Sequence, residues 1–164
     1  MLAENTNVPP VGSPAPDFDL SSTSGDRVRL SSFRGTQSVL IAFFPLAFTS
    51  TCTTELCDFS EDYAVFVQHG VAVLPISVDS VPTLREFKAK YGMKTELLSD
   101  FKREAGVSYG VMWQDAFFTN RAYFLIDKDG MIRWEHVEAT PGGKRSNSEI
   151  LAEIAKLEQP FTTV

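Results

Sequence analysis

Cys52 and Cys57, the two cysteines of the chain, follow an apolar run over residues 39–44. The run predicts a buried strand, and the amphipathic residues after the next short loop predict a helix whose first turn contains Cys52. A helix N-terminus carries unpaired N–H groups and a partial positive charge, and both favour an anion. Because the thiolate is the form of cysteine that reacts, this position predicts that Cys52 is a nucleophile. The alternative is a buried cysteine with a purely structural role.

Two residues that precede Cys52, Pro45 and Thr49, strengthen the hypothesis that Cys52 is a nucleophile. Pro45 and Thr49 precede it in the pattern Pro-x-x-x-Thr-x-x-Cys, in the loop between the strand and the helix. Pro45 has a fixed φ and no N–H, so it can shield the loop and set its direction. Thr49 brings a hydroxyl close to the thiol, although a lone Thr at this position is commonly a helix cap. The pattern resembles the active-site motif of the peroxiredoxins, which are thiol-dependent peroxidases on a thioredoxin-like fold.

The resemblance covers nearly the whole chain and implies a definite chemistry. When a thiolate displaces one oxygen of a peroxide, negative charge grows on the oxygen that leaves, so the site must supply hydrogen-bond donors in a dry pocket. We expect the Thr49 hydroxyl and the backbone N–H of Cys52 to be these donors. In the peroxiredoxins the Thr hydroxyl contacts both the thiolate and the peroxide, which implies the same role for Thr49.

A cation beside the thiolate would stabilise it, and Arg121 is the candidate. It stands at the start of an apolar strand, 121–126, where a charge without a partner is costly, although a surface Arg at a strand end is the simpler alternative. Its rivals, Arg103 and Arg133, are expected in a polar helix and in an exposed hairpin. Peroxiredoxins place an active-site Arg at the start of a strand in this region. The resemblance also implies that Glu55 supports this Arg, whereas its position alone equally predicts a solvated acid of the first helical turn.

Cys57 lies five residues after Cys52, and the two side chains of an intact helix at that spacing point in different directions, about 7.5 Å apart along the axis. A disulfide needs Cα atoms within about 6.8 Å of each other, so this pair can bond only if the first turns unwind. We expect Cys52 to be oxidised to a sulfenic acid, which either Cys57 or an external thiol then resolves. The alternative for Cys57 is a buried bystander.

Two subgroups of the peroxiredoxins share features with this stretch. A second cysteine five residues after the first resembles the resolving position of bacterioferritin comigratory protein, the PrxQ type. The residues 43–49 instead resemble the AhpE subgroup, which has one cysteine. The sequence therefore lies between an AhpE-like and a PrxQ-like peroxiredoxin.

Composition and charge exclude several other classes. The chain has 164 residues, 43% of them hydrophobic, and a net charge of −6, so we expect one globular domain and no nucleic-acid surface, which would be basic. No apolar run approaches the length of a transmembrane helix, and the first residues lack the features of a signal peptide. Two cysteines do not make a secreted disulfide scaffold, and we therefore expect a cytoplasmic protein.

The remaining pattern predicts the α/β class. Residues 1–10 are expected to form a flexible N-terminal arm, and 11–164 a single domain with an N-terminal β-hairpin. The predicted strands are 38–44, 71–78, 97–98, 121–126 and 131–137, and the predicted helices are 52–68, 82–91, 101–107 and 147–157, with an aromatic loop over 108–119. This order describes a thioredoxin-like fold, in which helices flank a central mixed sheet.

We therefore predict a thiol peroxidase that reduces hydrogen peroxide and organic hydroperoxides, and the resemblance implies a thioredoxin-like or low-molecular-weight thiol as reductant and a monomer or homodimer. A peroxidase of this kind needs no metal, haem or flavin, and we expect none. His69 and His136 are also too scattered to complete a zinc site with the cysteines. A thioredoxin-type thiol–disulfide oxidoreductase would need C-x-x-C, and Glu55 stands where its second cysteine would be. The third possibility is a non-enzymatic redox-sensing domain.

Overall fold

Two apolar runs form the parallel strands at the centre of the molecule, β3 (Ser38–Phe43) and β4 (Val71–Ser77), in a computed structural model that describes residues 7–113 and 115–158. Parallel strands that are buried on both faces have continuous hydrophobic sequences, which explains why these two lack polar alternation. The sheet is mixed, because β8 pairs with β3 in the antiparallel sense. Its seven strands lie in the order β2-β1-β5-β4-β3-β8-β9.

The other strands of this sheet are short or lie toward its edges. They are β1 (Asp19–Ser22), β2 (Arg27–Arg29), β5 (Leu98–Ser99), β8 (Ala122–Ile126) and β9 (Ile132–Val137). Strands β1 and β2 form the predicted N-terminal hairpin, and β8 and β9 form a second one. The expected thioredoxin-like α/β architecture, a mixed sheet flanked by helices, is confirmed.

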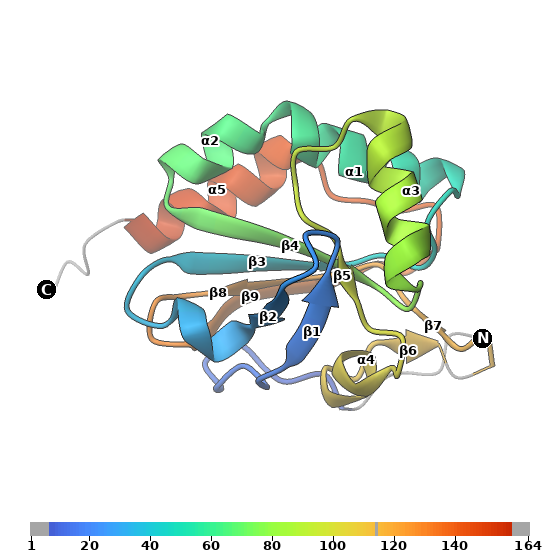
Figure 1. Ribbon diagram of the computed structural model, residues 1–164. Coiled ribbons are helices and arrows are strands. Elements are labelled where there is room, and N and C mark those ends of the chain that lie inside the picture. The colour runs from blue at the N-terminus through green and yellow to red at the C-terminus, as the bar shows by residue number, and fades with distance from the viewer. Residues whose placement is uncertain (1–6, 114, 159–164) are drawn as a thin grey trace, which may run out of the picture.

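Helices cover both faces of the sheet (Figure 1). On one face lie α1 (Ser50–Glu61), α2 (Tyr63–Gln68) and α5 (Asn147–Glu158), and α4 (Glu104–Ser108) lies on the other. Successive strand residues point to opposite faces, so Leu40 packs with Phe59 and Ile154 in one apolar cluster while Ile41 packs with Tyr109 in another. Helix α3 (Val81–Tyr91) covers the end of β4 near α1, where Leu84 and Phe87 join a third cluster.

The predicted single helix over 52–68 is wrong in its extent. It begins at Ser50 and is broken at Asp62, which leaves α1 and α2 as separate helices. In the second helix Phe66 is buried, whereas Tyr63 and Val67 are 38% and 55% exposed. No Gly or Pro marks the break. Instead, Asn147 of α5 donates its side-chain N–H to the Asp62 carboxylate, a contact between residues far apart in the sequence.

Helix boundaries elsewhere follow local signals more closely. Helix α3 has the expected form, with the Ser80 side chain accepting from the N–H of Thr83, and Gly92 in the left-handed conformation at its end. The helix predicted over 101–107 begins only at Glu104, because the Asp100 carboxylate caps its first turn by accepting two backbone N–H groups. The predicted aromatic loop over 108–119 contains a small hairpin, β6 (Met112–Trp113) with β7 (Phe118–Thr119).

Residues 1–6 of the predicted N-terminal arm and residues 159–164 of the predicted domain lie outside the described residues. Val8, which belongs to the predicted arm and is described, packs partly buried against the core.

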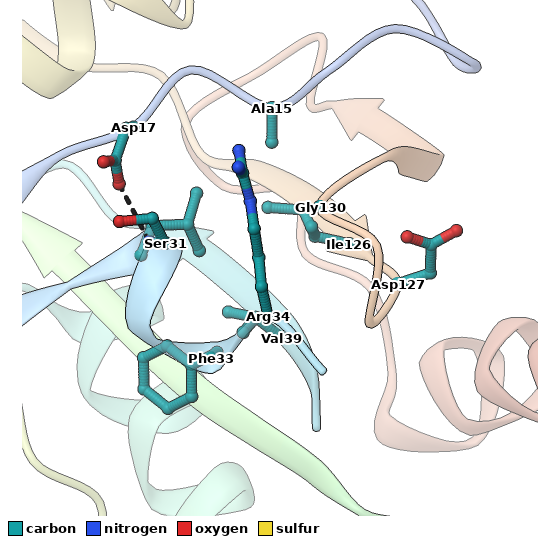
Figure 2. A pocket seen from close by; sticks show the side chains of 10 residues that line it. Ala15, Asp17, Ser31, Phe33, Arg34, Val39, Ile126, Asp127 and Gly130 are labelled. Carbon is teal, nitrogen blue, oxygen red and sulfur yellow. Dashed lines mark hydrogen bonds between the residues drawn. The ribbon is translucent and has the colours of Figure 1, made fainter. Parts of the chain in front are cut away.

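A cavity of about 10 Å³ lies between the N-terminal segment and the β8–β9 turn. Figure 2 shows the Arg34 side chain crossing it beside Gly130. Room for about one water is too little for a substrate, and none of the predicted site residues lines this cavity.

Within the described ranges, no helix is both long enough and apolar enough to cross a lipid bilayer.

Candidate active site

Cys52 lies where strand β3 passes into helix α1. The connection runs through Pro45, which is buried, and through Phe48, whose φ of 66° is unusual for a residue other than glycine. The loop is fixed from the end of the neighbouring strand β4, since the Asp79 carboxylate accepts the N–H of Ala47 at 2.8 Å and the hydroxyl of Ser77 at 2.7 Å. The sheet therefore determines where the helix begins.

The thiol of Cys52 is 1% exposed and lies in the first turn of α1. The helical hydrogen bonds begin with the bond from Thr53 N–H to the Thr49 carbonyl at 2.9 Å, so the N–H of Cys52 precedes the helical ladder and has no acceptor within it. Cys52 belongs to a buried apolar cluster that also contains Leu56 and Leu84. The site thus combines a dry environment with the positive end of a helix.

Thr49 occupies the cap position of α1 but does not act as a side-chain cap. Its hydroxyl donates to the carbonyl of Leu46 at 2.7 Å, and the residue is exposed. A hydroxyl has one proton, so a second partner of Thr49 Oγ1 must be a donor to its lone pairs. The expected donation from Thr49 toward the reacting atoms is therefore not the arrangement seen here.

Arg121 contacts the sulfur directly. Its Nη2 donates to Cys52 Sγ at 3.1 Å, and its Nη1 donates to Glu55 Oε1 at 2.9 Å. The side chain is 1% exposed, so it is not the surface Arg of the simpler alternative. Burial by itself lowers its pKa, but the neighbouring Glu55 and Cys52 raise the pKa of Arg121 above its ordinary value. The guanidinium is a permanent positive charge beside the thiol.

The two rival arginines are engaged elsewhere. Arg103 donates to the backbone carbonyls of Phe101 and Phe117, and Arg133 pairs with Asp127. Of the three candidates, the structure brings Arg121 to Cys52.

Glu55 is 2% exposed, so it is not a solvated acid of the first turn. Its two oxygens accept from different donors, Oε1 from Arg121 and Oε2 from the phenol of Tyr123. Burial raises the pKa of Glu55, against the opposing effects of the Arg121 charge and of both hydrogen bonds. Because each oxygen accepts a hydrogen bond, these contacts stabilise the ionised form of the carboxyl group against the effect of burial.

Cys57 lies further along α1, and both cysteines are free thiols within an intact helix. It is half-buried and packs against the same apolar cluster as Cys52. Burial and the charge of the adjacent Asp58 raise the pKa of Cys57. The thiol form of Cys57 is therefore favoured at neutral pH.

Sequence reasoning missed Tyr123 and the segment 138–147. Tyr123 is two residues after Arg121, which directly precedes β8, and in an extended segment this spacing places two side chains on the same side. The spacing was therefore a signal that could have identified Tyr123. Pro141 accepts from Arg121 Nη2 at 3.5 Å, and the N–H of Glu138 donates to the Arg121 carbonyl at 2.9 Å. These contacts depend on the path of a loop, for which the sequence has no periodic signal.

Among the described residues, no group of three or more His, Cys, Asp and Glu side chains is arranged to hold a metal ion. The candidate site consists of the Cys52 thiol, the Arg121 guanidinium, the Glu55 carboxylate and the N-terminus of α1.

Comparisons by family model, by sequence and by structure all find alkyl hydroperoxide reductases or peroxiredoxins. A model of the AhpC/TSA family matches residues 11–135. Alkyl hydroperoxide reductase E of Mycobacterium tuberculosis (strain ATCC 25618 / H37Rv) is 39% identical over 137 residues, which are 82% of this chain and 89% of that protein. The chloroplastic peroxiredoxin Q of Oryza sativa subsp. japonica is 36% identical over 125 residues, 75% of this chain and 57% of that protein. The crystal structure of the reduced 2-Cys peroxiredoxin of Plasmodium vivax is similar with a TM-score of 0.84 and 31% identity, covering 90% of this chain and 81% of that one.

Proposed function

The chain belongs to the AhpC/TSA family and is a peroxiredoxin of the AhpE/PrxQ type, a thiol-dependent peroxidase, and we propose that Cys52 is the residue with which it attacks the peroxide. The observation that carries this proposal is the contact of 3.1 Å between Arg121 Nη2 and Cys52 Sγ at a helix N-terminus. A guanidinium and unpaired backbone N–H groups both favour the thiolate over the thiol. Cys57 has the opposite surroundings, since an acid follows it directly.

In the proposed reaction the Cys52 thiolate attacks the terminal oxygen of a hydroperoxide. An S–O bond forms as the O–O bond breaks, the sulfur is oxidised to a sulfenic acid, and the leaving oxygen takes up a proton to become an alcohol, or water from hydrogen peroxide. The Arg121 guanidinium and the N–H of Cys52 stabilise the charge that moves onto the leaving oxygen. Thr49 Oγ1, with its proton donated to Leu46, accepts from the peroxide O–H and orients it.

Resolution of the sulfenic acid follows by one of two routes. The Cys57 thiol condenses with it to form a disulfide and release water, or an external thiol does so and forms a mixed disulfide. The internal route requires α1 to unwind before Cys57, because the spacing within a helix does not suit a disulfide. The Asp58 side chain pairs with Lys144 at 2.8 Å and its carbonyl accepts from Asn147 at 2.8 Å, so these contacts oppose unwinding that reaches Cys57.

Matched serine variants of the two cysteines test these roles. Cys52→Ser should abolish peroxide consumption with little change in the melting temperature, whereas Cys57→Ser should keep the first oxidation at a rate within about twofold of the parent protein. Mass spectrometry of the peroxide-treated proteins separates resolution by Cys57 from resolution by an external thiol. Resolution by Cys57 predicts an internal Cys52–Cys57 disulfide in the parent protein. It also predicts a sulfenic acid or an external adduct on Cys52 in Cys57→Ser. Near-normal turnover in Cys52→Ser would refute the assignment of the nucleophile.

The reductant is a thiol, and we propose a thioredoxin-like protein or a low-molecular-weight thiol of the cytoplasm. The cytoplasm is a reducing compartment that maintains such thiol donors. Peroxide consumption in the presence of thioredoxin, glutaredoxin or a small thiol, each supplied with its own reducing system, identifies the donor. A thioredoxin-type exchange enzyme would reduce insulin disulfides, and this protein should fail that assay because Glu55, bound to Arg121, occupies the position of the second cysteine of C-x-x-C.

A further inference from the structure

We propose that Tyr123 is a positioning residue of the peroxidase site, because its phenol holds the Glu55 carboxylate and, through it, the Arg121 guanidinium against Cys52. The inference rests on the proposed roles of Cys52 and Arg121 and adds a residue that does not touch the sulfur. Tyr123 belongs to strand β8, Arg121 directly precedes that strand, and Glu55 comes from α1. The phenol therefore joins the helix that carries the thiol to the strand that follows the cation.

The direction of each hydrogen bond at the phenol is fixed. The backbone N–H of Arg145 donates to Tyr123 Oη at 3.0 Å, and a backbone N–H has no other option. The single phenol proton is therefore donated to Glu55 Oε2. Burial and the Glu55 charge raise the pKa of Tyr123, so the phenol keeps this proton at neutral pH. Tyr123 thus serves Glu55 as a donor in the same way that Arg121 does on the other oxygen.

The phenol also has little freedom to move. Tyr123 is fully buried and pairs with Ala42 of β3 on one side and with His136 of β9 on the other. Its ring packs 6.0 Å from Trp134 and 6.4 Å from His136, measured between ring centroids. The sheet therefore fixes the phenol, and the carboxylate that accepts from it is oriented by a rigid support.

The guanidinium depends on this support because its other contacts are few. Nη1 binds Glu55, Nη2 binds Cys52 and makes a long contact of 3.5 Å to the Pro141 carbonyl, and Nε has no hydrogen-bond partner in the described part of the chain. If the phenol is removed, Glu55 Oε2 becomes a buried acceptor without a donor, and the carboxylate gains either by rotating or by binding a proton. Either change weakens the bond to Nη1 and releases the guanidinium from its position at the sulfur.

The test compares two buried tyrosines that each lose one hydroxyl. Tyr123→Phe removes the donor to Glu55, and Tyr109→Phe is the matched control, since Tyr109 is fully buried and donates to the Pro16 carbonyl at 2.7 Å on the other side of the sheet. We expect Tyr123→Phe to lower the second-order rate constant for oxidation by hydrogen peroxide about 10- to 100-fold, since small misplacements of catalytic groups have effects of this size. We expect Tyr109→Phe to stay within about twofold, with a comparable loss of melting temperature.

Two further readouts separate positioning from a general loss of structure. The pH at which the peroxide reaction reaches half of its maximal rate should rise in Tyr123→Phe and stay constant in Tyr109→Phe, because only the former loosens the cation beside the sulfur. In a double-mutant cycle, Tyr123→Phe should add little to the loss already caused by Glu55→Gln, because both act on one contact. Equal rates and equal pH profiles in the two Tyr→Phe variants, or fully additive losses in the cycle, would overturn the proposal.

The same assay distinguishes failure of this inference from failure of the proposed function. If Cys52→Ser loses the reaction while both Tyr→Phe variants keep it, the nucleophile assignment holds and the positioning role is refuted. If Cys52→Ser keeps the reaction, the proposed function fails and this inference fails with it.

Discussion

At the residue scale, the guanidinium of Arg121 serves two partners with two different nitrogens. Nη2 is directed at Cys52 Sγ and Nη1 at Glu55 Oε1, in surroundings from which water is excluded. The planar fork of arginine allows this division, whereas the ammonium of lysine is a single point of charge. The carboxylate and the sulfur therefore hold the cation between them, and the position of each depends on the other.

Arg121→Lys tests this division of work. Lysine keeps the positive charge but cannot bind both partners in the same geometry, so the rate constant with hydrogen peroxide should fall about 10²- to 10³-fold, as expected for the loss of one well-placed donor. Arg103→Lys is the control, because Arg103 also makes two side-chain hydrogen bonds, to backbone carbonyls away from Cys52. Competition kinetics for peroxide measures both variants. A rate for Arg121→Lys within twofold of the parent would contradict the proposed role.

The surroundings of Cys57 lead to a prediction about pH. Burial and the charge of Asp58 raise its pKa above the ordinary value of 9.0, so less of it is ionised at any given pH than of an exposed thiol. In a Cys52→Ser background, alkylation of Cys57 by iodoacetamide should reach half of its maximal rate above pH 9, and Asp58→Asn should move that midpoint to lower pH. A midpoint at or below that of free cysteine would contradict the assigned surroundings. The matched control is Glu61→Gln, an exposed acid on the same helix.

At the scale of elements, helix α1 has two ends with different attachments. Its N-terminal part, which contains Cys52 and Glu55, is joined to Arg121, the residue directly before strand β8. Its C-terminal part is joined to the start of α5, since Asn147 donates to the Asp58 carbonyl and to the Asp62 carboxylate, each at 2.8 Å. If Cys52 is the nucleophile as proposed, oxidation of its sulfur changes the partner of Arg121, and we expect this to loosen the first attachment and to leave the second in place.

Asn147→Ala should weaken the second attachment. The loss of two hydrogen bonds from one side chain predicts a drop of about 1–2 kcal/mol in the free energy of unfolding. If Cys57 resolves the sulfenic acid by local unwinding of α1, the same change should speed formation of the internal disulfide by up to about tenfold, the factor that corresponds to 1.4 kcal/mol. Quenched-flow mass spectrometry after one addition of peroxide measures this step.

The neighbouring substitution Ser148→Ala is the control for this prediction, because the exposed Ser148 hydroxyl bonds to Ser146 within its own turn. Its disulfide should form at the parent rate. If Asn147→Ala loses stability but forms the disulfide no faster than Ser148→Ala, the unwinding of α1 is not limited by this attachment.

At the scale of the whole molecule, the parts that could be predicted are those with a local signal. The apolar run 39–44 predicted the central strand, and Pro82 and Gly92 marked the ends of α3 closely. The break at Asp62 could not be predicted, because its partner Asn147 is 85 positions away. The motif before Cys52 and the strand next to Arg121 could both be recognised from the sequence pattern. Strand β3 pairs with β8 in the antiparallel sense, and this pairing brings the loop before Cys52 close to Arg121.

The finer arrangement of the site depends on contacts between distant segments. Nothing in the spacing of Thr49 indicates that its proton is donated to Leu46. The donor role of Tyr123 depends on the N–H of Arg145, which belongs to a loop without regular secondary structure. The directions of the hydrogen bonds in the site could therefore not be predicted from the sequence.

The contact between Cys52 and Arg121 joins positions that are 69 apart in the chain. The backbone N–H that binds the phenol of Tyr123 belongs to Arg145, which is 22 positions after Tyr123. During synthesis on the ribosome, the cysteine emerges long before the cation and the loop that position it. The growing polypeptide therefore cannot make both contacts until residue 145 has been added. With the role proposed for Cys52, we expect its reaction with peroxide to become fast only after that point.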